Sequence, residues 1–155
     1  MANTDKPNGF TPAYHLYGGA ISSAKMRIES GYGTAIMSGD VVNLSGGYVI
    51  QGTATGTPAG IFHGVQWTAS DGTPKWSNQW TARTEDAVAY IYRDPGIAYE
   101  AQFTAGTPAV TFIGNKYTLS TTAGSTTNGR SKEGVTATTS SGIALCLGFV
   151  DEPSN

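Results

Sequence analysis

The sequence predicts an all-β protein: a compact antiparallel β-barrel or β-sandwich with long irregular loops and an extended N-terminal arm. Three observations predict this class. Short apolar segments recur along the chain between clusters of Gly, Ser, Asp and Asn, as strands and turns do. Several of these segments alternate apolar and polar residues, which is the pattern of half-buried strands. No window sustains helical periodicity, since the nearest candidate, TPAVTFIGN, is short and rich in β-branched residues.

The composition predicts a weakly charged protein with one domain. A chain of 155 residues has the size of a single domain. Charged residues make up 13% of the chain and its net charge is −2, so we expect no nucleic-acid partner. No apolar run is long enough for a membrane helix or a signal peptide, so we expect no membrane partner. The lone Cys146 cannot form an intrachain disulfide, which suits a reducing cytoplasm.

Residues 1–20 predict an extended arm, and residues 21–155 predict a single all-β domain. Pro7, Gly9 and Pro12 disfavour both a helix and a central strand. The arm is rich in aromatic residues, so we expect it to lie on its own domain or on a neighbouring protein. Its candidate contact residues are Phe10, Tyr14, Leu16 and Tyr17.

Strand and turn signals follow the arm. KMRIES, residues 25–30, alternates so that Met26 and Ile28 share one face. The pair Gly46-Gly47 is expected to form the turn between two short strands. AVAYIYR, residues 87–93, is apolar on both faces and is expected to be the central strand of a sheet.

The C-terminal third predicts one exposed and one buried segment. Residues 121–141 are almost all small and polar, so we expect an exposed loop or a mobile edge. IALCLGFV, residues 143–150, alternates large and small apolar residues. This alternation predicts a buried strand whose small face lies against another backbone.

GIFHGVQW, residues 60–67, places a single histidine in an apolar segment. Strict alternation would put His63 on the same face as Ile61, Val65 and Trp67. A lone strand histidine without a partner motif is more simply a half-buried structural residue than a catalytic base. We therefore expect His63 to bond a backbone group or to lie in an interface.

The turn signal Ser70-Asp71-Gly72-Thr73 predicts a hairpin after this strand. The hairpin would bring three tryptophans together. We expect such an aromatic cluster to serve as core or as protein interface, with a sugar-stacking platform as the alternative. The cluster consists of Trp67, Trp76 and Trp80.

The sequence predicts no catalytic, cofactor or metal site. His15 and His63 are the only histidines, and neither belongs to a nucleophile–base motif. The spacings that bind zinc, calcium or phosphate are absent. We therefore expect a protein that is not an enzyme. A glycan hydrolase, which needs an acidic pair in a cleft, is the lesser alternative, with Asp94 and Glu100 as its candidates.

Three further pieces occur in a characteristic order: GDVV at 39–42, G-x-F-x-G-V at 60–65 and DP-x-x-x-x-E-x-Q at 94–102. With the arm, the loop at 121–141 and the C-terminal segment, this layout resembles a family of small virion proteins of tailed bacteriophages. These proteins are the capsid decoration or cement proteins, notably those of marine phages and cyanophages. The resemblance spans nearly the whole chain, and none of its motifs is catalytic.

The resemblance implies a structural protein that binds the outside of the phage head where subunits of the major capsid protein meet, and that stabilises the shell. It implies a homo-oligomer, with a trimer favoured over a dimer, made in the host cytoplasm and carried on the outer capsid surface. It supplies no catalytic residues. From the residues themselves we expect the arm to touch the capsid or a neighbouring protomer. The alternative function is a carbohydrate-binding surface module that attaches the virion to host polysaccharide.

Overall fold

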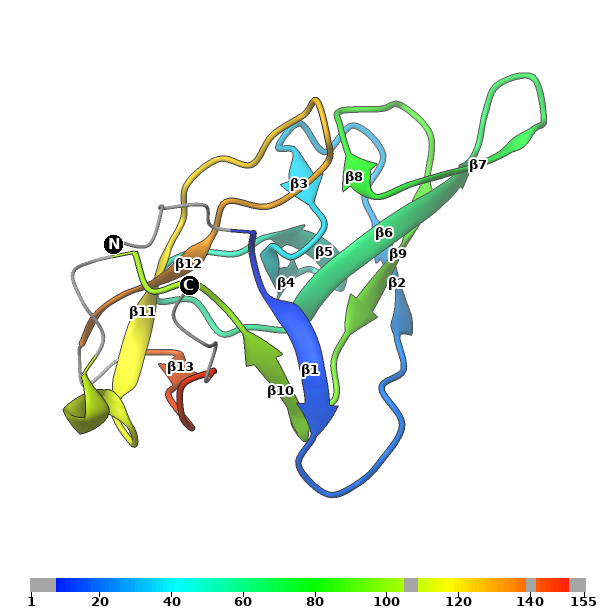
Figure 1. Ribbon diagram of the computed structural model, residues 1–155. Helices are drawn as coiled ribbons and strands as arrows, with labels where there is room; N and C mark the ends of the chain where they lie inside the picture. The colour runs from blue at the N-terminus through cyan, green and yellow to red at the C-terminus, as the bar shows by residue number, and fades with distance from the viewer. Residues whose placement is uncertain (1–7, 105–108, 139–141, 151–155) are drawn as a thin grey trace.

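The computed structural model describes residues 8–104, 109–138 and 142–150, and this part of the chain contains strands and one short 3₁₀-helix but no α-helix (Figure 1). The strands are β1 (Thr11–His15), β2 (Ala24–Ile28), β3 (Ile36–Met37), β4 (Val41–Ser45), β5 (Tyr48–Gln51), β6 (Gly60–Thr68), β7 (Pro74–Ser77), β8 (Gln79–Trp80), β9 (Ala87–Tyr92), β10 (Ile97–Glu100), β11 (Lys116–Ser120), β12 (Gly134–Thr138) and β13 (Ala144–Leu145). The 3₁₀-helix is η1 (Val110–Phe112).

The largest sheet has the strand order β2-β9-β6-β4-β5, with β7 paired to the long strand β6. All of its pairs are antiparallel. The sheet curls so that its end strands β2 and β5 approach each other without forming a ladder. Strand β9 lies between β2 and β6, which confirms the prediction of a central strand from the apolar run AVAYIYR.

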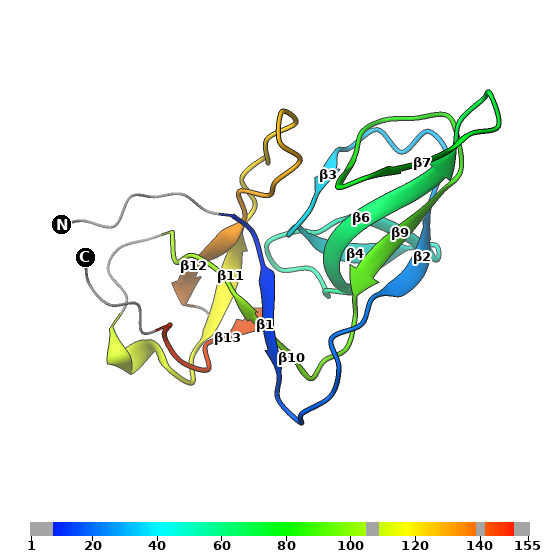
Figure 2. The same ribbon diagram turned by 45° about the vertical axis from the view of Figure 1, so that its right-hand side comes forward.

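Three smaller antiparallel sheets complete the fold: β1-β10, β12-β11-β13 and β3-β8. Figure 2 shows the large sheet on the right and the β11–β13 group on the left, with β1 and β10 between them. None of the sheets closes into a barrel within the described residues. The all-β prediction is therefore confirmed, and the arrangement is the sandwich-like one of the two architectures expected.

The first hydrophobic core lies on the inner face of the large sheet. Strand β9 alternates buried and half-buried residues, and Ile28 of β2 is buried while Lys25 and Arg27 are exposed. This is the alternation expected for KMRIES. Trp80 is fully buried in this core, and its indole Nε1–H donates to the carbonyl of Tyr32 at 2.9 Å. The buried ring therefore keeps its polar group satisfied.

A second core joins the large sheet to the smaller ones. It consists of four buried side chains, with Tyr92, Tyr99 and Val135 among those packed against it. The four come from the residue before β1, from β4, from β6 and from β11, so segments far apart in sequence meet here. They are Phe10, Val41, Ile61 and Leu119.

Both predicted hairpin turns are present. Gly46 and Gly47 connect β4 to β5 with φ values of 57° and 89°, which suit the two-residue hairpin turn that favours glycine. In the turn after β6, Asp71 Oδ1 accepts from the Thr73 backbone N–H at 2.9 Å and from its hydroxyl at 2.6 Å. Gly72 in that turn has a φ of 82°.

Replacing Gly72 by alanine is expected to lower the free energy of unfolding by about 1 kcal/mol, because a Cβ disfavours positive φ. A Cβ at this position would meet nothing within 4 Å, so the cost is conformational and not steric. Urea denaturation measures the effect. Gly72→Asn is the control and should cost less, since Asn tolerates this region. Equal stability of the alanine variant and the wild type would contradict this account of the turn.

Strand β6 departs from the expected alternation. The register with β9 shifts between Phe62 and Gly64, so that His63 is the extra residue of a β-bulge. Ile61, Phe62 and Val65 are buried, whereas His63 is exposed. The predicted face shared by His63 with Ile61, Val65 and Trp67 is therefore wrong, because the bulge reverses the side-chain direction at one position.

Two expectations for the C-terminal third are also corrected, the first in part and the second as a whole. The segment 121–141 is predicted as an exposed loop or a mobile edge. Residues 121–130 are mostly exposed and β12 is an edge strand, but Ser131 and Glu133 are buried, so this part of the prediction is wrong; residues 139–141 lie outside the described part. The segment 143–150 was expected to be a buried strand. Only Ala144 and Leu145 form a strand, and the residues after them are mostly exposed.

Candidate interaction surfaces

The predicted arm lies on its own domain. Strand β1 pairs antiparallel with β10, with a register irregularity between Pro12 and Tyr14. Phe10 just before it is only 8% exposed, and its backbone N–H donates to the carbonyl of Gly39 at 2.8 Å. Phe10 is therefore a core residue, and its prediction as a contact for another protein is corrected. Residues 1–7 of the arm lie outside the described residues.

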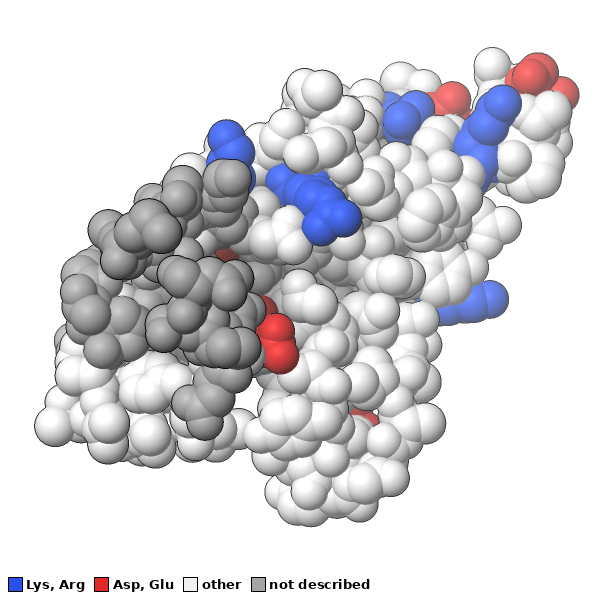
Figure 3. All heavy atoms as spheres, viewed as in Figure 1, with Lys and Arg blue, Asp and Glu red and all other residues white. Residues whose placement is uncertain are grey.

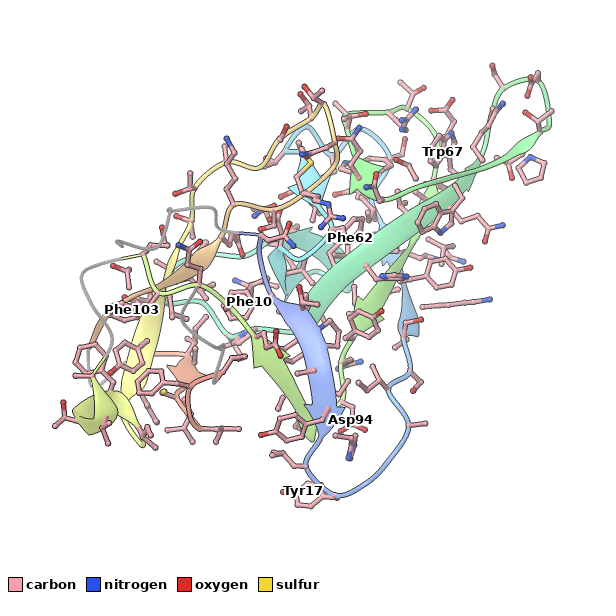
Figure 4. The ribbon with its side chains drawn as sticks, in the orientation of Figure 1. Phe10, Tyr17, Phe62, Trp67, Asp94 and Phe103 are labelled. Carbon is pink, nitrogen blue, oxygen red and sulfur yellow. The ribbon has the colours of Figure 1, made fainter. Side chains whose placement is uncertain are left out.

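The other three candidate contacts gather at the far end of β1. Tyr14, Leu16 and Tyr17 are 55%, 45% and 84% exposed. In Figure 4, Tyr17 lies at the tip of the loop that follows β1, close to Asp94. We call this surface of Tyr14, Leu16 and Tyr17 the β1 tip. Three of the four side chains that the sequence singled out are thus exposed.

Hydrogen bonds hold the β1 tip against the turn before β10. The Leu16 backbone N–H donates to the carbonyl of Gly96 at 2.7 Å, and the Tyr17 N–H donates to His15 Nδ1 at 3.1 Å. Because Nδ1 accepts, the ring proton is on Nε2, which lies 3.2 Å from Asp94 Oδ2. The Gly96 N–H and then His15 lower the pKa of Asp94 below its usual value. His15 and Asp94 therefore form a structural clamp for the tip.

The segment that carries the β1 tip has no charged residue of its own. Residues 11–23 contain no Asp, Glu, Lys or Arg. In Figure 3 the lower part of the molecule, formed by β1, β10 and the loop after β1, is mostly white, with small red areas and no blue. An exposed aromatic surface without charge is typical of the centre of a protein interface.

A second exposed apolar surface lies around β13 and η1. The two segments are joined by backbone hydrogen bonds from Gly114 to Cys146 and from Cys146 to Asn115. Leu147 is 50% exposed and Val110 78% exposed. We call this the C-terminal apolar surface; its exposed members are Val110, Ile113, Leu145, Leu147, Phe149 and Val150.

The three tryptophans do not form one cluster. Trp80 is fully buried, and Trp67 is half-buried against the same core with the Arg83 guanidinium 4.0 Å from its ring centroid. Trp76 pairs with Gln66 across the hairpin and is 55% exposed. The hairpin forms, but its pleat directs Trp67 and Trp76 to opposite faces. The aromatic cluster expected from the sequence is thus divided between core and surface.

A buried pair of carboxyl groups ties the two cores together. Glu133 is fully buried, and its Oε2 accepts from the Val41 backbone N–H at 2.7 Å while its Oε1 accepts from Gln51 Nε2 at 2.8 Å. Asp40 is 2% exposed and accepts from the Met37 backbone N–H at 2.7 Å. Glu133 from the segment before β12 therefore fastens that segment to β4 and β5.

Burial dominates the ionisation of this pair. The pKa of Glu133 is raised to about 8, chiefly by burial and also by the nearby Asp40. The hydrogen bonds from Val41 and Gln51 act in the other direction and lower this pKa. Burial also raises the pKa of Asp40, against the hydrogen bonds from Ser131, Met37 and Gln51. Because both groups are buried, they are closed to a substrate and serve the fold. Sequence reasoning missed Glu133, since SKEG gives the pattern of an exposed turn.

Asp94 and Glu100, the candidates for glycan hydrolysis, are both exposed, and Asp94 is occupied by the clamp on His15. No group of three His, Cys, Asp or Glu side chains able to hold a metal ion occurs in the described ranges. Across the same residues, no helix has the length and apolar character required to cross a bilayer. No protein-family model, curated protein or solved structure matches the chain.

Proposed function

We propose that this chain is a capsid decoration protein of a tailed bacteriophage, which binds the outer surface of the head through the β1 tip and stabilises the shell. The observation that carries the proposal is the β1 tip itself: two exposed tyrosines and a leucine on an uncharged loop that is fixed by the His15–Asp94 clamp. The phage assignment rests on the resemblance of the sequence layout. On this proposal the protein is made in the host cytoplasm and acts on the virion.

The chemistry of the tip suits binding to the major capsid protein. Tyrosine supplies a large contact area and loses little side-chain entropy when it is ordered. The clamp holds the loop before binding, so little further ordering opposes association. A contact of standard size buries about 800 Å² per partner, more than three side chains supply. The neighbouring backbone of β1 and β10 would then form the rim.

The C-terminal apolar surface is the part of the chain best suited to contact further copies of itself. Its side chains are aliphatic or aromatic. A trimer that uses this surface would present several β1 tips to the shell. Repeated contacts around a symmetry axis strengthen binding through effective concentration, even where each contact is weak.

The proposal is tested by replacing the three tip residues together, as Tyr14→Ser, Leu16→Ser and Tyr17→Ser. We expect binding to purified heads that lack the protein to weaken at least about 10-fold, as loss of aromatic anchors does. Co-sedimentation with the heads measures it. Leu44→Ser, an exposed apolar position on β4, is the matched control and should bind as the wild type does. Unchanged binding of a folded triple variant would refute the role of the tip.

The arm cannot be tested by simple truncation. Deleting residues 1–17 would remove Phe10 from the second core and β1 from its pairing with β10. Such a protein would be destabilised for reasons unrelated to binding, because a lost core phenylalanine costs about 3 kcal/mol or more. The substitutions at exposed positions avoid this difficulty.

A further inference from the structure

The outer face of the large sheet carries an exposed aromatic surface apart from the β1 tip. Cross-strand pairs align its side chains in two rows. In one row Lys25 of β2 is opposite Tyr90 of β9, and Tyr90 is opposite Gly64 of β6. In the next row Arg27 is opposite Val88, Val88 is opposite Gln66, and Gln66 is opposite Trp76.

The ring of Trp76 lies on the backbone of Gly64. A Cβ placed on Gly64 would approach Cζ2 of Trp76 to 2.5 Å and its Cε2 to 3.0 Å. Because Gly64 has no side chain, the indole ring can pack directly on the backbone of β6. One side of the ring is supported by β6, and the residue remains 55% exposed. An aromatic ring held in this way offers a flat apolar platform to solvent.

Neighbouring polar rings are fixed around this platform. His63, the bulged residue of β6, lies edge-on to Trp76 at 6.2 Å between centroids and 5.2 Å from the ring of Tyr92. Its Nδ1 is 3.2 Å from the Tyr92 hydroxyl. The Tyr90 hydroxyl donates to Gln66 Oε1 at 2.8 Å. The bulge thus places a histidine with an exposed imidazole beside the platform instead of in the core.

The charge on these strands is of one sign. On this face strands β2, β6, β7 and β9 carry Lys25 and Arg27 and no Asp or Glu, whereas Lys75 is opposite Trp67 on the other face. Lys25 Nζ lies 5.7 Å from the centroid of the Tyr90 ring, so a cation lies next to an aromatic ring on this face. The face therefore combines flat rings, hydrogen-bonding amide and hydroxyl groups, and positive charge.

We propose that this face binds an acidic polysaccharide, with a sugar ring stacked on Trp76 and a carboxylate or sulfate group paired with Lys25 and Arg27. The apolar face of a pyranose matches an indole platform, and its hydroxyls match Gln66, Tyr90 and His63. The positive charge of the strands complements an anionic polymer. A single-stranded nucleic acid also stacks on aromatic rings, but Lys25 and Arg27 are too few to form the broad cationic track that a phosphate backbone requires.

This inference stands independently of capsid binding, since it uses none of the residues of the β1 tip. The full chain is titrated by calorimetry with three anionic polymers: polygalacturonate, alginate and heparin. Dextran serves as the neutral polymer and oligodeoxythymidine as the nucleic acid. We expect binding to at least one anionic polysaccharide, weakened at least 10-fold by Trp76→Ala and largely kept by Trp76→Phe.

Two further variants separate charge from stacking. Lys25→Gln with Arg27→Gln should weaken binding and reduce its dependence on salt, whereas Leu44→Ala, an exposed apolar position elsewhere on the sheet, should bind as the wild type does. Near-ultraviolet circular dichroism shows that each variant is folded. The proposal is overturned if none of the three polysaccharides binds, if folded Trp76→Ala binds as tightly as the wild type, or if oligodeoxythymidine binds more tightly than all three.

Discussion

Replacing Glu133 by alanine is expected to lower the free energy of unfolding by about 2–5 kcal/mol. The side chain is fully buried and accepts hydrogen bonds from the Val41 backbone N–H and from Gln51. Its removal leaves the buried Val41 N–H and the half-buried Gln51 amide without this acceptor, and a buried donor left unpaired costs about 1–3 kcal/mol. Removing Glu133 also removes its repulsion toward Asp40, which would stabilise the variant. This gain is small near pH 7, because a pKa of about 8 leaves Glu133 mostly neutral there. Urea denaturation measures the difference.

Glu133→Gln is the matched control for this substitution. Glutamine has nearly the same shape, so its carbonyl can accept from Val41, and Gln51 can turn its amide to accept from the new one. We expect it to cost less than half of what alanine costs. Since Glu133 fastens the segment before β12 to β4 and β5, the alanine variant should also lose amide-exchange protection in β11 and β12. An alanine variant as stable as the wild type would show that the hydrogen bonds of Glu133 to Val41 and Gln51 do not stabilise the fold.

The free energy of unfolding is expected to fall as the pH rises from about 4.5 to about 8. In the folded protein the pKa of Glu133 is raised from 4.5 to about 8, chiefly by burial. Within this window the unfolded chain has released the proton while the folded protein keeps it. The folded state therefore binds more protons, and stability decreases with pH. The slope of one such group reaches about 1.4 kcal/mol per pH unit.

Asp40 contributes with the same sign, because burial raises its pKa as well. The contribution of Glu133 is fully present below pH 4.5 and is lost once the pH has passed about 8. Urea denaturation at intervals between pH 4 and pH 9 gives the profile. Glu133→Gln should flatten it, since glutamine does not titrate. A wild-type profile that is level or rising across this window would contradict the buried, neutral state of Glu133.

Local signals predicted the paired strands well. The alternation at Met26 and Ile28, the glycine pair after β4, the Asp-Gly turn after β6 and the apolar run of β9 all depend on neighbours in sequence. These features are set by backbone preference and by the period of a strand, which are visible without tertiary contacts.

The features that sequence reasoning missed depend on distant contacts. The bulge at His63 is a property of the pairing between β6 and β9, and the sequence GIFHGVQW contains no local signal that predicts it. Glu133 is buried because Val41 and Gln51, more than 80 residues away, supply its donors. Phe10 is buried because the chain of the arm returns to Gly39. The apolar C-terminal segment was assigned to the core because it is hydrophobic, yet it lies on the surface.

The central claim is that the chain decorates a phage head through the β1 tip. A density map of purified heads, determined with and without the added protein, tests it most directly. The account predicts extra density on the outer surface at the junctions of capsid subunits, with the loop that carries Tyr17 against the shell. Heads that gain no density, or copies that bind with this loop pointing into solvent, would contradict it.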